Sequence, residues 1–291
     1  MATKQVACVE IGGIPISLTT TDPTFFNLLT ARYQGFLGSL PAKFALDFEI
    51  IEAAPASDDD VRVRREGPEW RIERGDFCAR WNQRTGMGTV RQNANPYSLD
   101  SVLRILHSLI LAESGGFLLH AASGICQGGA CLFSGVSGAG KTTLTRLAPP
   151  DVTLLTDEIS YIRPGSDAND ISRFAFGTPF AGELARPGEN TKAPIAALFF
   201  LEKGSENRID DIPSAEAVRL LMRNILFFAE DQRLVERILD SACDFVVRIP
   251  IRRLTFYPDT RVWSEVRRFV QDFGPGAISY NRTREGANIR V

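Results

Sequence analysis

The sequence is poor in the residue patterns that build disulfide frameworks and zinc sites. Its five cysteines are odd in number, widely spaced and without a Cys-x-x-Cys pair. Such usage argues against a disulfide scaffold and against a zinc centre, and it is typical of a protein in a reducing compartment. We therefore expect a cytoplasmic location.

An excess of charge of one sign is also missing. The 33 Lys and Arg residues oppose 35 Asp and Glu residues, a formal net charge of −2. Without a global field we expect no nucleic-acid partner and no membrane surface partner, so any phosphate binding must be local. No apolar run has the length of a membrane span, and the first residues lack the pattern of a secretory signal peptide, so no obvious route of export is expected. The 44% hydrophobic and 23% charged residues in a chain of 291 indicate a globular protein of one or two domains.

Two regions of the chain differ in pattern. Residues 1–97 alternate short apolar stretches with turn residues, which predicts a small β-rich N-terminal region. Leu99–Glu113 has apolar residues at helical spacing, with Ser98 or Asp100 near its start, and is expected to join the two regions. Residues 98–291 mix strands and helices, which predicts an α/β domain.

Further elements are expected in the second region. They are a short helix from Lys141 that stops at Pro149 and Pro150, strands at 152–156, 160–164, 171–176, 194–203 and 244–251, and helices near 214–229, 231–242 and 260–272. The acidic run 56–60 is expected to be a solvated loop, and the tail from Gly274 to be weakly ordered.

A phosphate-binding loop is the strongest motif. Gly135–Thr142 fits the pattern GxxxxGK[ST] in full, after an apolar strand and at the start of a helix. Glycines let successive backbone N–H groups turn toward an anion, Lys141 reaches the β- and γ-phosphates, and the Thr142 hydroxyl binds Mg²⁺. The alternative is a glycine-rich turn that binds nothing. The candidate nucleotide-binding residues are Gly135, Ser137, Gly138, Ala139, Gly140, Lys141, Thr142 and Thr143.

An acidic pair, Asp157 and Glu158, follows the apolar strand 152–156. Carboxylates at the carboxyl end of such a strand lie where ligands of α/β sheets collect. Asp157 could hold Mg²⁺ through water or accept the proton of an attacking hydroxyl, with Glu158 taking the other task; a solvated strand end is the alternative. The pair comes 16 residues after Lys141, sooner than in common ATPases and GTPases, and there is no LSGGQ or NKxD segment.

One histidine is a further candidate. His120 ends the apolar stretch Leu118–His120, one predicted hairpin before the phosphate loop. A lone histidine after apolar residues is more often packed in a core than catalytic, so the residue alone decides neither role.

Together these motifs resemble the C-terminal catalytic domain of the HPr serine kinase/phosphorylase family, over about residues 99–272. The string is Leu118–His120, the phosphate loop, LTDE at 155–158, GTPFAGEL at 177–184 and the apolar run that ends at Lys203. The resemblance implies a P-loop nucleotide-binding domain of the HPr kinase and phosphoenolpyruvate carboxykinase type. It also implies transfer of the γ-phosphate of ATP, with Mg²⁺, to a serine of a protein such as HPr.

The resemblance also implies roles for single residues. His120 would lie close to the transferred phosphate, and the pair Asp157 and Glu158 would contain the catalytic base. The segment 177–184 would lie near the active site, where Glu183 would join Thr142 and Asp157 as a metal ligand and Arg186 would pair with phosphate; a surface connection is the alternative for this segment. Family members are often oligomeric, so a homo-oligomer is expected.

The function expected from the sequence is a Mg-ATP-dependent kinase that phosphorylates a serine hydroxyl of a protein or peptide acceptor, HPr-like or other. The longer signature segment that supports phosphorylase activity in bifunctional family members is not found after the acidic strand. The acidic pair is aspartate followed by glutamate, where the full-length enzymes tend to have two aspartates. Simple kinase activity is therefore favoured over phosphorolysis. The alternatives are a small-molecule kinase on the same fold, an ATPase or nucleotide-dependent regulatory module, and a scaffold that keeps a relic loop. The role of the N-terminal region is left open.

Overall fold

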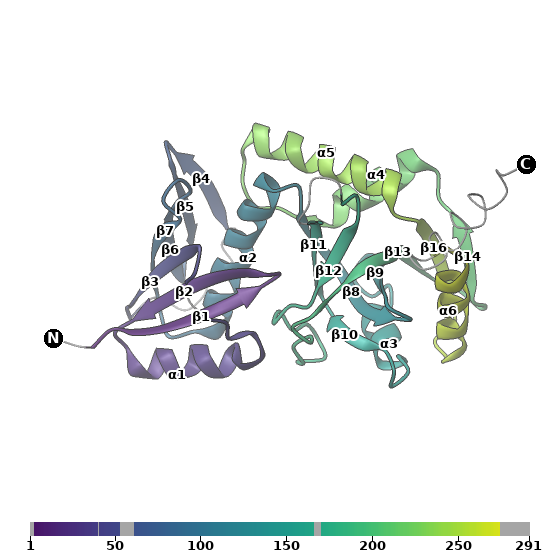
Figure 1. The fold of residues 1–291 in the computed structure, drawn as a ribbon, viewed down its shortest axis with the longest axis horizontal. Coiled ribbons are helices and arrows are strands. Elements are labelled where there is room, and N and C mark those ends of the chain that lie inside the picture. Colours follow the sequence, from purple (N-terminus) through teal and green to yellow (C-terminus); the bar gives the residue numbers. More distant parts are fainter. Residues whose placement is uncertain (1–2, 40, 53–60, 166–169, 274–291) are drawn as a thin grey trace, which may run out of the picture. The chain divides into compact units, whose positions relative to one another are not determined.

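The computed structural model describes residues 3–39, 41–52, 61–165 and 170–273. The acidic run 56–60 and the tail from Gly274 lie outside the described residues. The chain forms two compact units, whose elements are labelled in Figure 1. The first unit contains Met1–Ser114 and Phe227–Arg237, and the second contains Gly115–Leu226 and Ile238–Val291.

The first unit is built on a seven-stranded sheet in the order β1-β2-β3-β7-β6-β5-β4. Its strands alternate buried and exposed positions, as expected for a sheet with one face on a core. Gly12 and Gly13, at φ 63° and 70°, make the tight turn between the first two strands. The predicted β-rich region is confirmed, and its strands are β1 (Gln5–Ile11), β2 (Ile14–Thr20), β3 (Phe44–Ile50), β4 (Arg62–Glu66), β5 (Glu69–Arg74), β6 (Phe77–Asn82) and β7 (Met87–Gln92).

Helix α2 (Pro96–Glu113) belongs to the first unit, so the units divide after Ser114 and not at the expected boundary of 97 and 98. The helix begins earlier than predicted because the Asn95 side chain accepts a hydrogen bond from the Tyr97 N–H, at 2.9 Å. Asp100, expected at the start of the helix, is instead buried inside it and accepts a hydrogen bond of 2.6 Å from the Tyr33 hydroxyl. This buried contact fixes the helix to the first unit.

Helix α1 (Pro23–Arg32) was not expected from the sequence. Its start carries a readable signal, since Asp22 accepts a hydrogen bond from the Phe25 N–H at 2.8 Å and Pro23 occupies the first turn. The apolar face is short, with only Phe25 and Leu29 buried, which explains why periodicity did not reveal the helix.

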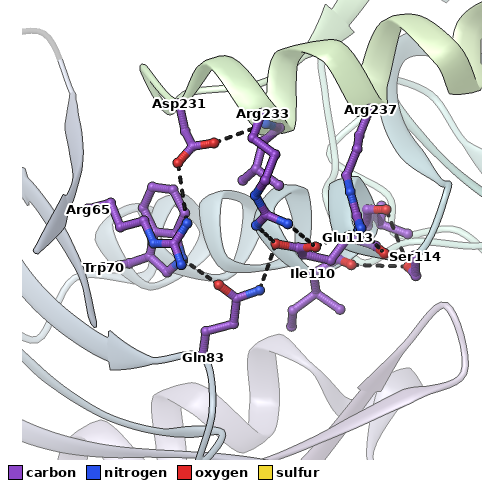
Figure 2. Close-up of polar contacts among 11 residues, drawn as sticks. Arg65, Trp70, Gln83, Ile110, Glu113, Ser114, Asp231, Arg233 and Arg237 are labelled. Carbon is purple, nitrogen blue, oxygen red and sulfur yellow. Dashed lines mark hydrogen bonds and ion pairs between the residues drawn. The ribbon is translucent and has the colours of Figure 1, made fainter. Parts of the chain in front are cut away.

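A polar cluster holds the second segment of this unit, Phe227–Arg237, against the end of α2 (Figure 2). The Glu113 carboxylate accepts hydrogen bonds from Gln83 at 2.8 Å and from Arg237 at 2.6 Å, and it also pairs with Arg233. Burial raises the pKa of Glu113, but the hydrogen bonds from Gln83 and Arg233 and the charges of the two arginines outweigh it, so the pKa lies below its ordinary value.

Replacement of Glu113 by glutamine is expected to lower the free energy of unfolding at pH 7 by about 1–3 kcal/mol, because two arginines lose a charged acceptor. A carboxylate with a lowered pKa stabilises the folded state above its unfolded pKa, and this stability disappears as the pH falls through the folded pKa. Urea unfolding should therefore show wild type and variant converging only below about pH 4.5. Glu230→Gln, at an exposed position of the same segment, is the control. A constant difference from pH 7 to acid would contradict this role for Glu113.

The second unit is built on a nine-stranded sheet with the path β10-β8-β11-β12-β13-β16-β14, in which β9 pairs with both β8 and β13 and β15 pairs with β8. Of these pairings β13 with β9 and β13 with β16 are parallel, and the others are antiparallel. The unit is therefore mixed α/β. Its strands are β8 (Phe117–Cys126), β9 (Gly129–Ser134), β10 (Thr153–Thr156), β11 (Ile159–Pro164), β12 (Arg173–Phe176), β13 (Lys192–Lys203), β14 (Arg208–Asp211), β15 (Ile225–Leu226) and β16 (Ile251–Phe256).

Four more α-helices are α3 (Lys141–Arg146), α4 (Ser214–Asn224), α5 (Gln232–Arg248) and α6 (Arg261–Phe273), and a short 3-10 helix, η1 (Gln34–Phe36), follows α1. The predicted strand at 244–251 is wrong except at its last residue, because α5 continues to Arg248 and the strand β16 begins only at Ile251. Ile238, Ala242 and Phe245 are buried at helical spacing, and this periodicity outweighs the β-branched pair near the end of the helix. Within the described residues no helix is both long and apolar enough to cross a membrane.

Candidate functional site

The glycine-rich loop 135–140 connects β9 to α3, as the motif predicts. Gly138 and Gly140 have φ of 76° and 110°, which side-chain-bearing residues rarely adopt. A Cβ at Gly140 would also lie 2.5 Å from the Phe256 ring. Both the backbone angle and this close approach therefore require glycine at position 140. Gly138 has nothing within 4 Å of where its Cβ would stand, so this side of the loop is open to a ligand.

The sheet brings the candidate residues to one edge. β9 and β10 both run antiparallel to β8, so their carboxyl ends point the same way, and the loop and the acidic pair follow these two ends. His120 lies near the start of β8, next to Ala121, which faces the last residue of β9, Ser134. The Ser134 hydroxyl donates to the His120 carbonyl at 2.8 Å, which fixes the two strands to each other at this level.

These residues surround one cavity of about 340 Å³. The candidates that line it are His120, Ser137, Gly138, Gly140, Lys141, Thr142, Thr143, Asp157, Glu158 and Glu183. Two candidates, Gly135 and the buried Ala139, do not line it. Gly182 and Lys203 complete the lining, and neither was proposed as a site residue from the sequence.

Lys141 crosses the inside of the loop. Its ammonium donates a hydrogen bond to the Gly135 carbonyl at 2.9 Å. Burial lowers the pKa of Lys141, and the charges of Glu158 and Glu183 oppose that effect. The ammonium has two more protons to donate, so it can hold the loop and bind a phosphate oxygen together.

A hydroxyl and a carboxylate of the cavity lining are hydrogen-bonded to each other. The Thr142 Oγ1 donates a hydrogen bond to Glu183 Oε2 at 3.0 Å, although Glu183 comes from the loop after β12. Oxygen donors of this kind suit Mg²⁺, which binds few protein ligands and takes the others from phosphate and water. In the part of the chain that the structure describes, no group of three or more His, Cys, Asp and Glu residues could hold a metal without such help.

Asp157 is buried and fixes the loop that carries Glu183. Its Oδ1 accepts a hydrogen bond from the Gly182 N–H at 2.8 Å, and its Oδ2 accepts one from the Leu184 N–H at 2.9 Å. A Cβ at Gly182 would lie 2.9 Å from the Glu158 Cβ, so a glycine is needed for this approach. Each carboxylate oxygen keeps a second lone pair for a ligand. The sequence motif did not reveal this anchoring role of Asp157, although Gly182 was a possible signal.

His120 is half-buried in the cavity wall. Burial lowers its pKa, and the nearby positive charge of Lys141 lowers it further. The imidazole is therefore neutral at pH 7, with one nitrogen able to donate and the other able to accept.

A proton NMR titration tests this environment, because the chain has only two histidines. We expect the His120 ring to titrate below pH 6.5 and to move toward that value in Lys141→Ala, which removes the repelling charge. The His120→Asn variant assigns the signal. An unshifted titration that Lys141→Ala leaves in place would show that the two side chains are not neighbours.

Arg186, expected from the resemblance to pair with phosphate, lies outside this cavity. It lines a different cavity, and its ion pair, at 3.9 Å, is with Glu189. The geometry therefore does not place Arg186 on a phosphate at the loop.

Comparison with known proteins gives one distant structural similarity and one match to a protein family. The structure of the Hpr(Ser) kinase/phosphatase from Coxiella burnetii is 9% identical, with a TM-score of 0.33, and the match covers 59% of this chain and 98% of that chain. A likeness at this level does not transfer an activity. No curated protein matches the chain. The model of a different family, described as SynChlorMet cassette protein ScmC, matches residues 92–271, more than half of the chain. The chain therefore belongs to the ScmC family, which is a different family from the HPr kinases that its motifs resemble.

Proposed function

We propose that the second unit is a Mg-ATP-dependent phosphotransferase that moves the γ-phosphate to a serine hydroxyl of a protein or peptide. The observation that carries the proposal is the content of one cavity: a glycine loop with its lysine, a hydroxyl bonded to a carboxylate, and an acidic pair. Phosphoryl transfer depends almost entirely on positioning and charge stabilisation, and these groups supply both.

The residues present fit a magnesium nucleotide. Three carboxylates, Asp157, Glu158 and Glu183, face two ammonium groups, Lys141 and Lys203, around the cavity. Triphosphate adds further negative charge, so a divalent cation is needed to balance the site. Thr142 and Glu183 supply the hard oxygen ligands for Mg²⁺, which when bound would neutralise charge on the β- and γ-phosphates.

The chain's own residues account for the transfer. The loop amides and Lys141 hold the phosphates. A new bond forms between the acceptor oxygen and the γ-phosphorus, while the bond from that phosphorus to the bridging oxygen breaks and ADP leaves with the electron pair. Asp157 accepts the hydroxyl proton, and Glu158 and neutral His120 orient the acceptor hydroxyl and the transferred group.

This assignment makes Mg²⁺ binding depend on Glu183. We expect Glu183→Gln to raise the Mg²⁺ concentration needed for half-maximal ADP release roughly tenfold, because one anionic ligand becomes neutral. Binding of ATP without Mg²⁺ should change little. Glu206→Gln, at an exposed position of the same unit outside the cavity lining, is the control.

ADP release measured over a Mg²⁺ series therefore tests the proposal. The proposal requires saturable, Mg²⁺-dependent release in wild type and a displaced curve in Glu183→Gln. Identical curves would remove Glu183 from the metal site. Release in wild type without any phosphorylated product would favour the alternative, an ATPase or nucleotide-dependent regulatory module, and a phosphorylated small molecule would favour a small-molecule kinase.

A further inference from the structure

A second cavity, of about 870 Å³, lies in the same unit beside the phosphate cavity. Residues from α3, from the loop after β12 and from α6 line it, among them Leu144, Arg146, Leu184, Arg186 and Trp263. We propose that this cavity is the acceptor site and that it binds an acidic peptide segment next to the serine to be phosphorylated. The inference rests on the proposed phosphotransferase function.

The two cavities share a wall. Thr142 and Glu183, joined by a hydrogen bond of 3.0 Å, line the phosphate cavity, and Leu184 lines the second one. Asp157 is hydrogen-bonded to Leu184 through Oδ2 and to Gly182 through Oδ1. The carboxylate proposed as the base therefore lines the phosphate cavity and lies one hydrogen bond from Leu184, which lines the second cavity.

The requirements of in-line transfer favour an acceptor in this position. The attacking and leaving oxygens lie on opposite sides of the γ-phosphorus. Asp157 follows β10, on the β8 side of the loop strand β9, whereas Lys203 ends β13, on the other side of β9. Because the base lies on the β8 side of β9, we infer that the nucleoside lies on the β13 side. The cavity of about 870 Å³ then remains for the acceptor.

The chemistry of the lining selects the segment. The floor is apolar, with Leu144 and Trp263 buried, so it suits one apolar side chain of a peptide. The rim carries the exposed guanidinium groups of Arg146 and Arg186 and one carboxylate, Glu189. Arg186 meets Glu189 only at 3.9 Å, and among the described residues no ion pair involves Arg146. Two exposed cations beside an apolar floor complement a peptide that carries carboxylates.

The volume agrees with this occupant. Ligand pockets commonly measure about 300–1,000 Å³, so this cavity is near the upper end of the range and larger than a single amino acid requires.

Peptide binding without nucleotide tests the site separately from catalysis. Two fluorescein-labelled probes share the core Ala-Leu-Ser and continue with either Glu-Glu-Glu or Lys-Lys-Lys, and fluorescence anisotropy reports their binding. Wild type is expected to bind the acidic probe better than the basic one. In the double variant Arg146→Glu, Arg186→Glu, the affinity for the acidic probe should fall by roughly tenfold or more, and the affinity for the basic probe should rise. Arg219→Glu, an exposed residue of α4 outside the lining, should leave both unchanged.

Binding of the basic probe by the double variant would show at the same time that the variant is folded. Equal binding of both probes by wild type, or binding that the double reversal does not change, would overturn the acceptor site. Failure of wild type to bind the acidic probe would overturn it as well. None of these results depends on Mg-ATP binding. A protein that does not bind Mg-ATP would instead contradict the proposed phosphotransferase function.

Discussion

Replacement of Lys141 by alanine is expected to abolish most Mg-ATP-dependent activity, with a fall of roughly 10²–10³-fold in the transfer rate. The Lys141 ammonium is the positive charge inside the glycine loop, and it also donates to the Gly135 carbonyl. Its loss removes both a phosphate contact and a support of the loop. Titration calorimetry should therefore show weaker binding of Mg-ATP as well as slower transfer.

Lys192→Ala is the matched control for this change. Lys192 is exposed, lies in the same unit and packs over Phe174 and Phe176 away from the cavity. It should leave nucleotide binding unchanged. If Lys141→Ala bound Mg-ATP as tightly as wild type, the loop would not be the phosphate site.

Asp157→Asn is expected to slow transfer by roughly 10²–10⁴-fold, because the amide cannot take a proton from the acceptor hydroxyl. The structure adds a second consequence. Asparagine has one acceptor oxygen where aspartate has two, so its NH₂ group would oppose the N–H of either Gly182 or Leu184. The loop that carries Glu183 should then loosen, which proteolysis near residues 182–189 can measure.

Glu158→Gln separates the two effects, since it neutralises the neighbouring carboxylate and leaves both Asp157 hydrogen bonds in place. We expect Glu158→Gln to keep the loop protected from protease and to retain more transfer than Asp157→Asn. Loss of transfer in Glu158→Gln with normal transfer in Asp157→Asn would exchange the roles of the two acids.

Local patterns predicted much of the fold. Alternation of apolar residues is a property of each strand by itself, and it identified the strands of the first unit. The errors arose where competing signals overlap, as at the end of α5, where a β-branched pair lies on a helix that buries Ile238, Ala242 and Phe245. The boundary of the first unit depends on Asp100 and Glu113, whose partners lie far away in the chain.

The site shows the same division between local and long-range information. The phosphate loop and the acidic pair are contiguous motifs, so their residues could be named from the sequence. Lys203 could not, because it reaches the cavity through the parallel pairing of β13 with β9, a register that no local pattern contains. The bonds from Asp157 to the backbone of residues 182 and 184 were hidden for the same reason.

The most direct test of the phosphotransferase account is to incubate the protein with Mg-ATP labelled at the γ-phosphate, together with a lysate of its source cells, and to identify the labelled product. Wild type, Lys141→Ala and Asp157→Asn are compared side by side. The account predicts label on a serine of a protein or peptide, present with wild type and absent with both variants. Release of all the label as inorganic phosphate, with no phosphorylated acceptor, would contradict it.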